Sequence, residues 1–151
     1  MVKSRKRSVL VLGVLLAAGC GHGLRRHVAM PPPDASPRTV VQTYLAALDG
    51  HDRVTAAALL EPLWRRTVEH EVDPMLTNVK HLRVRHISAP TPTSLMHDGA
   101  YRGWQTTSVQ VVFILSQYHA QSMPNGTNDW GYVLARKSAS TPWRIVDEGQ
   151  G

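Results

Sequence analysis

Side chains that could carry out chemistry are sparse in this chain, and His86 is the first candidate. It lies in an alternating stretch, residues 79–88, where a strand would place it on one face with Leu82 and Val84. An imidazole held on such an apolar face can act as a general base. The pattern also fits a hydrogen-bonded histidine of the core or its rim, so we assign no catalytic residue.

Metal-ligating residue types cluster between Glu69 and Asp73, with His70 among them. Imidazole and carboxylate groups suit several divalent ions. Successive residues of a helix point about 100° apart, so His70 cannot converge on one ion with both of its neighbours. His81 and His86 lie five residues apart on the expected strand and therefore on opposite faces. We expect no metal site, and the sequence has no phosphate-binding loop or similar motif to indicate a cofactor.

The single cysteine, Cys20, follows a basic segment and a short apolar run. The run, Val9–Ala18, has roughly half of the ~20 residues that a helix needs to cross a bilayer. The whole segment resembles a bacterial lipoprotein signal peptide with its lipobox. The resemblance implies that residues 1–19 are removed and that Cys20 receives a lipid. The lipid would hold the protein outside the cytoplasm, on the outer face of the cell membrane.

The charge of the chain argues against one class of partner. The chain has 17 basic and 11 acidic side chains, a net charge of +6, but four of the cations lie within residues 1–19, which contain no acid. Residues 20–151 therefore carry 13 basic and 11 acidic side chains, a net charge of +2. We expect no nucleic-acid partner. Arg25 and Arg26 remain near the lipid, where each gains about 1 kcal/mol beside an anionic leaflet.

The chain after residue 19 divides into two parts. Residues 20–36 contain three consecutive prolines and little apolar periodicity, which indicates a lipidated flexible tether. Residues 37–151 contain helical and then alternating patterns, which indicates a single folded domain.

Helical patterns come first in this domain. Ser36 followed by proline is typical of a helix start, and apolar residues recur at helical spacing over 37–49. Gly50 is expected to end this helix in a left-handed conformation. Asp52 is expected to cap a second helix, and a third is expected over 62–70.

Beyond residue 78 the spacing changes from helical to alternating. Strands are expected over 79–88, 102–118, 129–137 and 142–147. The sequence therefore predicts an α+β fold in which N-terminal helices pack in a curved antiparallel sheet of about four strands.

Two segments resemble a known superfamily. SPRTVVQTYLAALDGHDRVTAAALL, residues 36–60, looks like the first two helices of the nuclear transport factor 2-like superfamily, which includes the ketosteroid isomerase-like and SnoaL-like domains. WRIVDEGQG, residues 143–151, is similar to the last strand of its small exported members. The resemblance implies a cone-shaped sheet with an apolar cavity open at one end. Tyr44 and Trp64 would lie at the wall of that pocket, and His86 is a third candidate for the wall.

Enzymes and binding modules both occur in that superfamily, so the fold alone selects no function. We expect a lipid-anchored cell-envelope protein whose non-catalytic domain binds a small apolar ligand or an envelope protein partner. One alternative is a lyase or isomerase that transfers a proton within the cavity of the cone. Another is a structural module that forms a homodimer.

Overall fold

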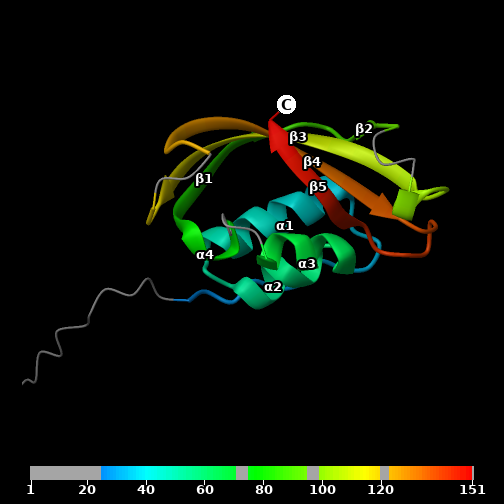
Figure 1. Ribbon diagram of the computed structural model, residues 1–151, viewed down its shortest axis with the longest axis horizontal. Helices are drawn as coiled ribbons and strands as arrows, with labels where there is room; N and C mark the ends of the chain where they lie inside the picture. The colour runs from blue at the N-terminus through cyan, green and yellow to red at the C-terminus, as the bar shows by residue number, and fades with distance from the viewer. Residues whose placement is uncertain (1–24, 71–74, 95–98, 120–122, 151) are drawn as a thin grey trace, which may run out of the picture.

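The computed structural model describes residues 25–70, 75–94, 99–119 and 123–150. The helices come first in the chain and lie along one face of an antiparallel sheet (Figure 1). This confirms the α+β prediction, although the sheet has five strands rather than about four. The elements are α1 (Pro37–Asp49), α2 (Arg53–Leu59), α3 (Pro62–His70), α4 (Met75–Asn78), β1 (Val79–Ile87), β2 (Thr91–Pro92), a 3-10 turn η1 (Gly99–Tyr101), β3 (Gln105–Gln117), β4 (Gly126–Arg136) and β5 (Arg144–Gln150).

The strand order is β1-β3-β4-β5, with β2 paired to the start of β3. β2 is the strand that the sequence did not predict. It has only two residues, one of them a proline, and so has no alternating pattern that could reveal it.

α1 begins and ends where its sequence predicts. The Ser36 hydroxyl accepts a hydrogen bond from the Thr39 amide at 3.2 Å, and a proline occupies the first turn. The expected left-handed cap is wrong, because Gly50 has a φ of −79° and it is His51 that has a positive φ, of 55°. Gly50 is needed for space instead, since a Cβ there would lie 2.9 Å from the carbonyl oxygen of Arg26.

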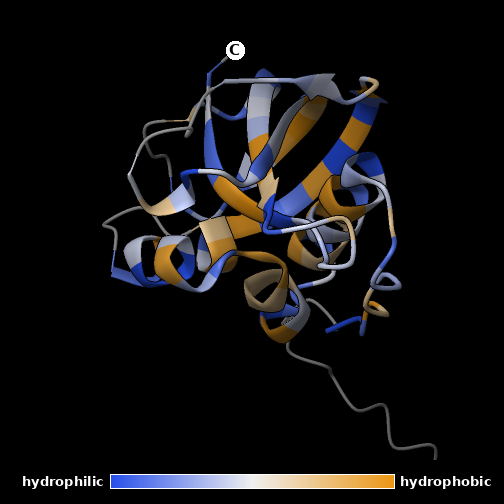
Figure 2. Cartoon of the chain, turned by 90° about the vertical axis from the view of Figure 1, so that its right-hand side faces the viewer, coloured by the Kyte–Doolittle hydropathy of each residue, from blue (hydrophilic) through white to orange (hydrophobic). Residues whose placement is uncertain are grey.

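The core lies between the helices and the sheet. α1 packs against β1 and β3, and α3 packs against β5. Figure 2 shows hydrophobic residues alternating with hydrophilic ones along the strands, as expected for a sheet whose two faces differ in polarity. We call the helix-facing side of the sheet its inner face. Its fully buried side chains include Val109, Val111, Phe113, Leu115, Tyr132, Leu134 and Ile145.

A register shift in β1 changes which side chains face the core. Val84 and Ile87 pair with core residues of β3, but His86 pairs with Val112, which is only half-buried. Directly paired residues point to the same side of a sheet. The shift between Val84 and His86 therefore turns His86 to the outer face and brings Ile87 to the inner face.

A register shift also occurs in β5. Ile145 pairs with an inner-face residue of β4, and Val146 is the extra residue that follows it. Strict alternation from Ile145 would point Glu148 outward. The extra residue instead pairs Glu148 with Tyr132, so that both side chains lie on the inner face.

The chain before α1 is docked onto the domain. The Arg26 amide donates to the Gly50 carbonyl at 2.8 Å, and the Val28 amide donates to the Asp52 carboxylate at 2.9 Å. The Thr55 hydroxyl donates to the Val28 carbonyl at 3.0 Å. We call residues 25–28 the strap. It lies within the stretch predicted as a flexible tether, but the sequence offers no periodic signal for contacts made through backbone groups.

The membrane signals of the sequence fall outside the described residues. Cys20, residues 1–19 and the first part of the predicted tether all lie there. Within the described ranges, no helix is both long enough and apolar enough to span a bilayer.

Candidate functional site

Two tyrosines meet in the centre of the core. Tyr44 reaches it from α1 and Tyr132 from the inner face of β4, and both side chains are fully buried. Their rings make an edge-to-face contact, with centroids 5.8 Å apart. Neither hydroxyl has a hydrogen-bond partner among the residues that the structure describes. Buried polar groups are nearly always paired, so this pair of phenols is the most unusual feature of the core.

The surroundings keep both phenols protonated. Burial raises the pKa of Tyr44 well above its usual value, and the nearby charge of Glu148 and the Tyr132 phenol raise it further. Burial, and then Glu148, raise the pKa of Tyr132 in the same way. Both groups are therefore neutral hydrogen-bond donors over the physiological pH range.

Glu148 comes to the site through the register shift in β5. It lies directly across from Tyr132 on the inner face and is half-buried. Its negative charge raises the pKa of both phenols. Bulges occur often next to functional sites because they re-aim one side chain without displacing the strand. Here the bulge brings a carboxylate to the inner face of the sheet, across from Tyr132.

Two tryptophans add further donors to the same core. Trp130 lies two residues before Tyr132 on the inner face of β4, and Trp64 packs against the core from α3. Both indole nitrogens are buried, and neither has a partner within the described ranges. Buried indole N–H groups normally have an acceptor. The described part of the core therefore presents four buried donors without acceptors.

α3 is held in place by Glu61. Its amide donates to the Ile145 carbonyl of β5 at 2.8 Å, and its carboxylate accepts the Leu63 amide at 2.7 Å and the Trp64 amide at 3.3 Å. The first turn of α3 is thus fixed to the edge strand of the sheet. This fixes the backbone that carries Trp64.

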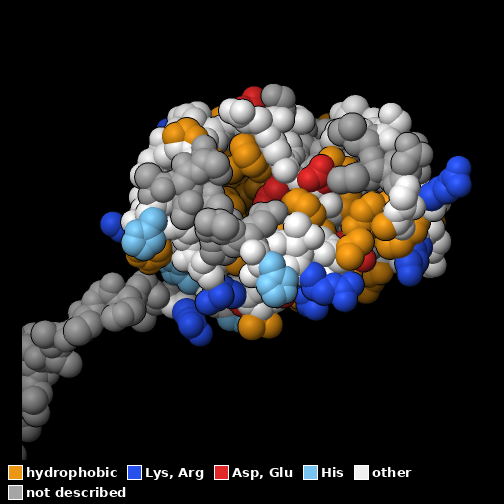
Figure 3. Space-filling view, viewed as in Figure 1, with side chains coloured by type: hydrophobic (Ala, Val, Ile, Leu, Met, Phe, Trp, Pro, Cys, Tyr) orange, Lys and Arg blue, Asp and Glu red, His pale blue; other side chains and the backbone are white. Residues whose placement is uncertain are grey.

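The surface of the molecule is hollowed between the sheet and the helices. Figure 3 shows a depression between β5 and the helices, in which hydrophobic and acidic side chains are visible. Glu148 lies on the inner face of β5, the side that faces the helices. An apolar depression with a few polar groups at its wall is typical of sites for small molecules.

Of the three predicted pocket residues, the structure brings two to the core. Tyr44 is fully buried and Trp64 is half-buried against the core. Whether they line a pocket remains a prediction. The expectation that His86 shares an apolar face is wrong, because the register shift in β1 turns it outward, where it is exposed.

Reasoning from the sequence missed Glu148 and did not select Tyr132. Alternation placed Tyr132 on one face with Trp130, so its face was predictable. Glu148 lay beyond the expected end of its strand, and a bulge decides which way it points. Part of the Glu69–Asp73 cluster, including Asp73, falls outside the described residues, and the described ranges contain no group of three or more residues that could hold a metal.

No family model matches this chain, and no curated protein matches it. A similar solved structure is that of a SEC-C motif-containing protein from Rhodopseudomonas palustris. It is 16% identical, the match covers 80% of this chain and 82% of that chain, and the TM-score is 0.46.

The resemblance to the nuclear transport factor 2-like superfamily is therefore corrected. The comparison found a SEC-C motif-containing protein, which has a different fold from that superfamily. The segments 36–60 and 143–151 matched in residue type only. Such patterns recur wherever an amphipathic helix or an edge strand covers a core.

Proposed function

We propose that this protein is a lipid-anchored protein of the cell envelope, and that its domain binds a small, largely apolar ligand carrying a hydrogen-bond acceptor such as a carbonyl oxygen. The observation that carries the proposal is the pair of buried phenols, Tyr44 and Tyr132, whose hydroxyl groups have no partner among the described residues. A buried donor without an acceptor costs about 1–3 kcal/mol. An arrangement with that cost is accounted for if a ligand supplies the acceptor.

The character of the ligand follows from the character of the wall. The phenols are neutral donors, so they favour an acceptor oxygen, and the side chains around them are apolar. Glu148 disfavours a second negative charge at the same place. A neutral molecule with an apolar body and a carbonyl group meets all of these conditions.

The lipid anchor is supported by the N-terminal sequence. A basic segment, an apolar run and small residues lead directly to Cys20, the arrangement of a lipoprotein signal. The modified cysteine would hold the domain on the outer face of the membrane.

Thermal unfolding with candidate ligands tests the binding proposal. Apolar ketones, esters and amides should raise the Tm of the membrane-extracted protein in proportion to RT ln(1 + [L]/Kd). Hydrocarbons of the same size should do so much less. Tyr132→Phe should weaken binding by about 2- to 10-fold, the value of one hydrogen bond.

The matched control is Tyr101→Phe. The Tyr101 hydroxyl is already bound to Glu61, at 3.0 Å, so its loss should leave ligand affinity unchanged. No Tm shift with any compound would refute the binding proposal. Equal shifts with carbonyl compounds and hydrocarbons would refute the role of the phenols.

A second candidate function is proton transfer, and the position of Glu148 favours it. The carboxylate could remove a proton from the carbon next to a bound carbonyl group; the C–H electron pair would form a C=C bond and the carbonyl π pair would move to the oxygen, which gives an enolate. The two phenols would donate hydrogen bonds to that oxygen. If the compound also has a C=C bond next to the carbon that lost the proton, the enolate is a dienolate, and return of the proton from Glu148 to its far carbon would give an isomer with a shifted double bond.

Exchange in deuterated water distinguishes this activity from simple binding. An enzyme would replace the hydrogen next to the carbonyl group of a bound compound with deuterium, and Glu148→Gln would stop the exchange. Glu148→Gln should still bind the compound. A ligand that binds without any exchange supports the non-catalytic function.

A further inference from the structure

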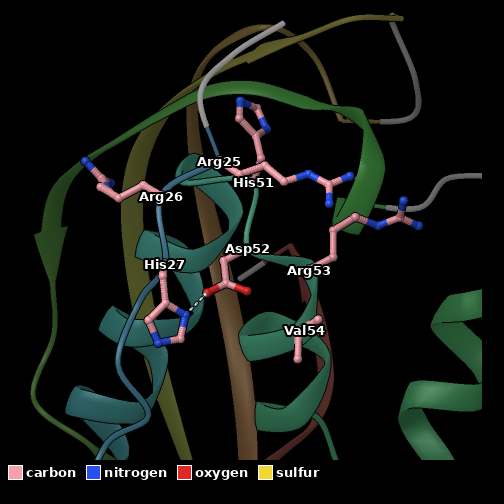
Figure 4. Close-up of a pocket in the computed structure, with 7 residues that line it drawn as sticks. All are labelled: Arg25, Arg26, His27, His51, Asp52, Arg53 and Val54. Carbon is pink, nitrogen blue, oxygen red and sulfur yellow. Dashed lines mark hydrogen bonds and ion pairs between the residues drawn. The ribbon is translucent and has the colours of Figure 1, made fainter.

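The strap and the start of α2 form a hollow with a basic rim. Its volume is about 210 Å³, and it lies where the strap crosses the corner between α1 and α2 (Figure 4). The lining residues are Arg25, Arg26, His27, His51, Asp52, Arg53 and Val54. Three arginines and two histidines thus surround one acid.

The Asp52 carboxylate already accepts hydrogen bonds from groups of the domain and the strap. The Asp52 carboxylate accepts from the Val28 amide at 2.9 Å, from the Thr55 amide at 3.1 Å and from the Thr55 hydroxyl at 3.0 Å. His27 Nδ1 lies 3.1 Å from it. The backbone hydrogen bonds from Val28 and Thr55 lower the pKa of Asp52 to about 2, so the carboxylate stays charged while it caps α2.

The arginines are less fully engaged. Arg26 forms an ion pair with Asp49 at 3.3 Å, and Asp49 also accepts a hydrogen bond from the Leu82 amide of the edge strand β1. Arg25 and Arg53 are exposed and have no acidic partner within the described ranges. In Figure 4 their side chains extend toward the same side, while Arg26 extends the other way. Two unpaired positive charges are therefore presented together.

An exposed apolar side chain lies among these cations. Val54 follows Arg53 in the first turn of α2, and 82% of its surface is exposed, the largest value among the exposed large hydrophobic residues of the described chain. Figure 3 shows basic and histidine side chains gathered along this lower edge of the molecule. Cations around an apolar side chain are typical of surfaces that contact the interface of an anionic bilayer.

The chain length brings this surface close to the proposed anchor. Cys20 is five residues from Arg25, and five fully extended residues span at most about 18 Å. The strap fixes Arg25 to the domain through Arg26 and Val28. A lipid on Cys20 would thus hold this surface, and no distant one, at the headgroup region.

We propose that the surface formed by Arg25, Arg53 and Val54 is a docking face for an anionic phospholipid bilayer, with the arginines on headgroup phosphates and Val54 at the acyl boundary. The inference rests on the proposed lipid anchor for its geometry. It adds to that anchor a defined orientation of the domain.

A fluorescent probe at position 54 tests the proposal on the lipidated full chain. Val54→Cys is labelled with an environment-sensitive nitrobenzoxadiazole, and the protein is reconstituted into vesicles of phosphatidylcholine alone or with phosphatidylglycerol. The anionic vesicles should shift the emission to shorter wavelength, and high salt should reverse the shift because exposed charges are screened. The same probe at Ala139, on the exposed turn between β4 and β5, should show no shift.

A variant that lacks the two arginine charges tests their contribution to docking. Arg25→Ala with Arg53→Ala should move the docking equilibrium by about 30-fold, roughly fivefold for each cation. Arg102→Ala, an exposed arginine that follows η1, should leave it unchanged. No emission shift at position 54 in anionic vesicles, or an equal shift in neutral ones, would overturn the proposal.

The lipid on Cys20 is tested separately in the same protein preparation. Maleimide should not react with Cys20 of the parent chain, because its sulfur would be held in a thioether. If Cys20 reacts, the lipid anchor is refuted, and the probe is then placed in a Cys20→Ser chain. Binding of that chain to anionic but not neutral vesicles would still support the docking face, and absence of binding would refute it.

Discussion

At the scale of single residues, Asp52 carries more contacts than its place as a helix cap requires. It binds the Val28 amide of the strap as well as the Thr55 amide of its own helix. The sequence predicted the cap, because aspartate before a helical pattern is a standard signal. It could not predict the strap contact, because a backbone amide 24 residues away has no sequence signature.

Asp52→Asn should destabilise the protein in a pH-dependent way. The pKa of Asp52 is about 2 in the folded protein and 3.8 without these contacts, so the stabilisation is complete above about pH 4 and is lost as the pH falls through 2. Between pH 7 and pH 4, urea unfolding should give the variant a free energy of unfolding roughly 1–2 kcal/mol below that of the natural chain. In the variant, the Val28 amide faces the neutral side-chain amide of asparagine in place of a carboxylate.

The difference in unfolding free energy between Asp52→Asn and the natural chain should shrink between pH 4 and pH 2. Asp34→Asn, an exposed acid in the turn before α1, should stay within about 0.5 kcal/mol of the natural chain throughout. A constant difference down to pH 2 would show that the charge of Asp52 does not hold the strap.

At the scale of elements, the packing of the strap depends on Gly50. A methyl group at this position would lie 2.9 Å from the Arg26 carbonyl and 3.1 Å from the Ala46 carbonyl, and both are backbone atoms that cannot turn away. Gly50→Ala should destabilise the protein by about 1–3 kcal/mol in urea unfolding. Gly149→Ala is the control, because an added Cβ there meets nothing within 4 Å. Equal stability of the two variants would mean that the strap does not pack as described.

The elements also show where sequence reasoning reaches its limit. Helix starts and long alternating runs were predictable, because Ser36, Asp52 and the apolar spacing each have a local cause. The register shifts before His86 and after Ile145 were not, because an extra residue in a strand depends on how the neighbouring strands pair. One shift removed His86 from the core face, and the other added Glu148 to it.

At the scale of the whole molecule, the proposed anchor predicts the fate of the first residues. Cys20→Ser should prevent both lipid addition and removal of residues 1–19, because the cysteine is the site of both steps in a lipoprotein signal. Mass spectrometry of the natural chain should show an N-terminal Cys20 bearing a lipid. An unmodified thiol, or a chain that keeps residues 1–19 with Cys20 intact, would contradict the anchor.

We propose that Tyr44 and Tyr132 are kept in the core for a ligand, at a cost in stability. Such a cost is expected of functional groups, since stabilising changes at a site usually impair its function. The claim is separable from the anchor, because it concerns only the folded domain.

The most direct test is urea unfolding of the ligand-free protein with single phenol deletions. Tyr44→Phe and Tyr132→Phe should be as stable as the natural chain or up to about 3 kcal/mol more stable, because each removes a buried donor without an acceptor. Tyr101→Phe should lose about 1 kcal/mol, because that hydroxyl is bonded to Glu61. If Tyr44→Phe and Tyr132→Phe lose as much unfolding free energy as Tyr101→Phe, the two hydroxyls stabilise the fold, and a ligand site is contradicted.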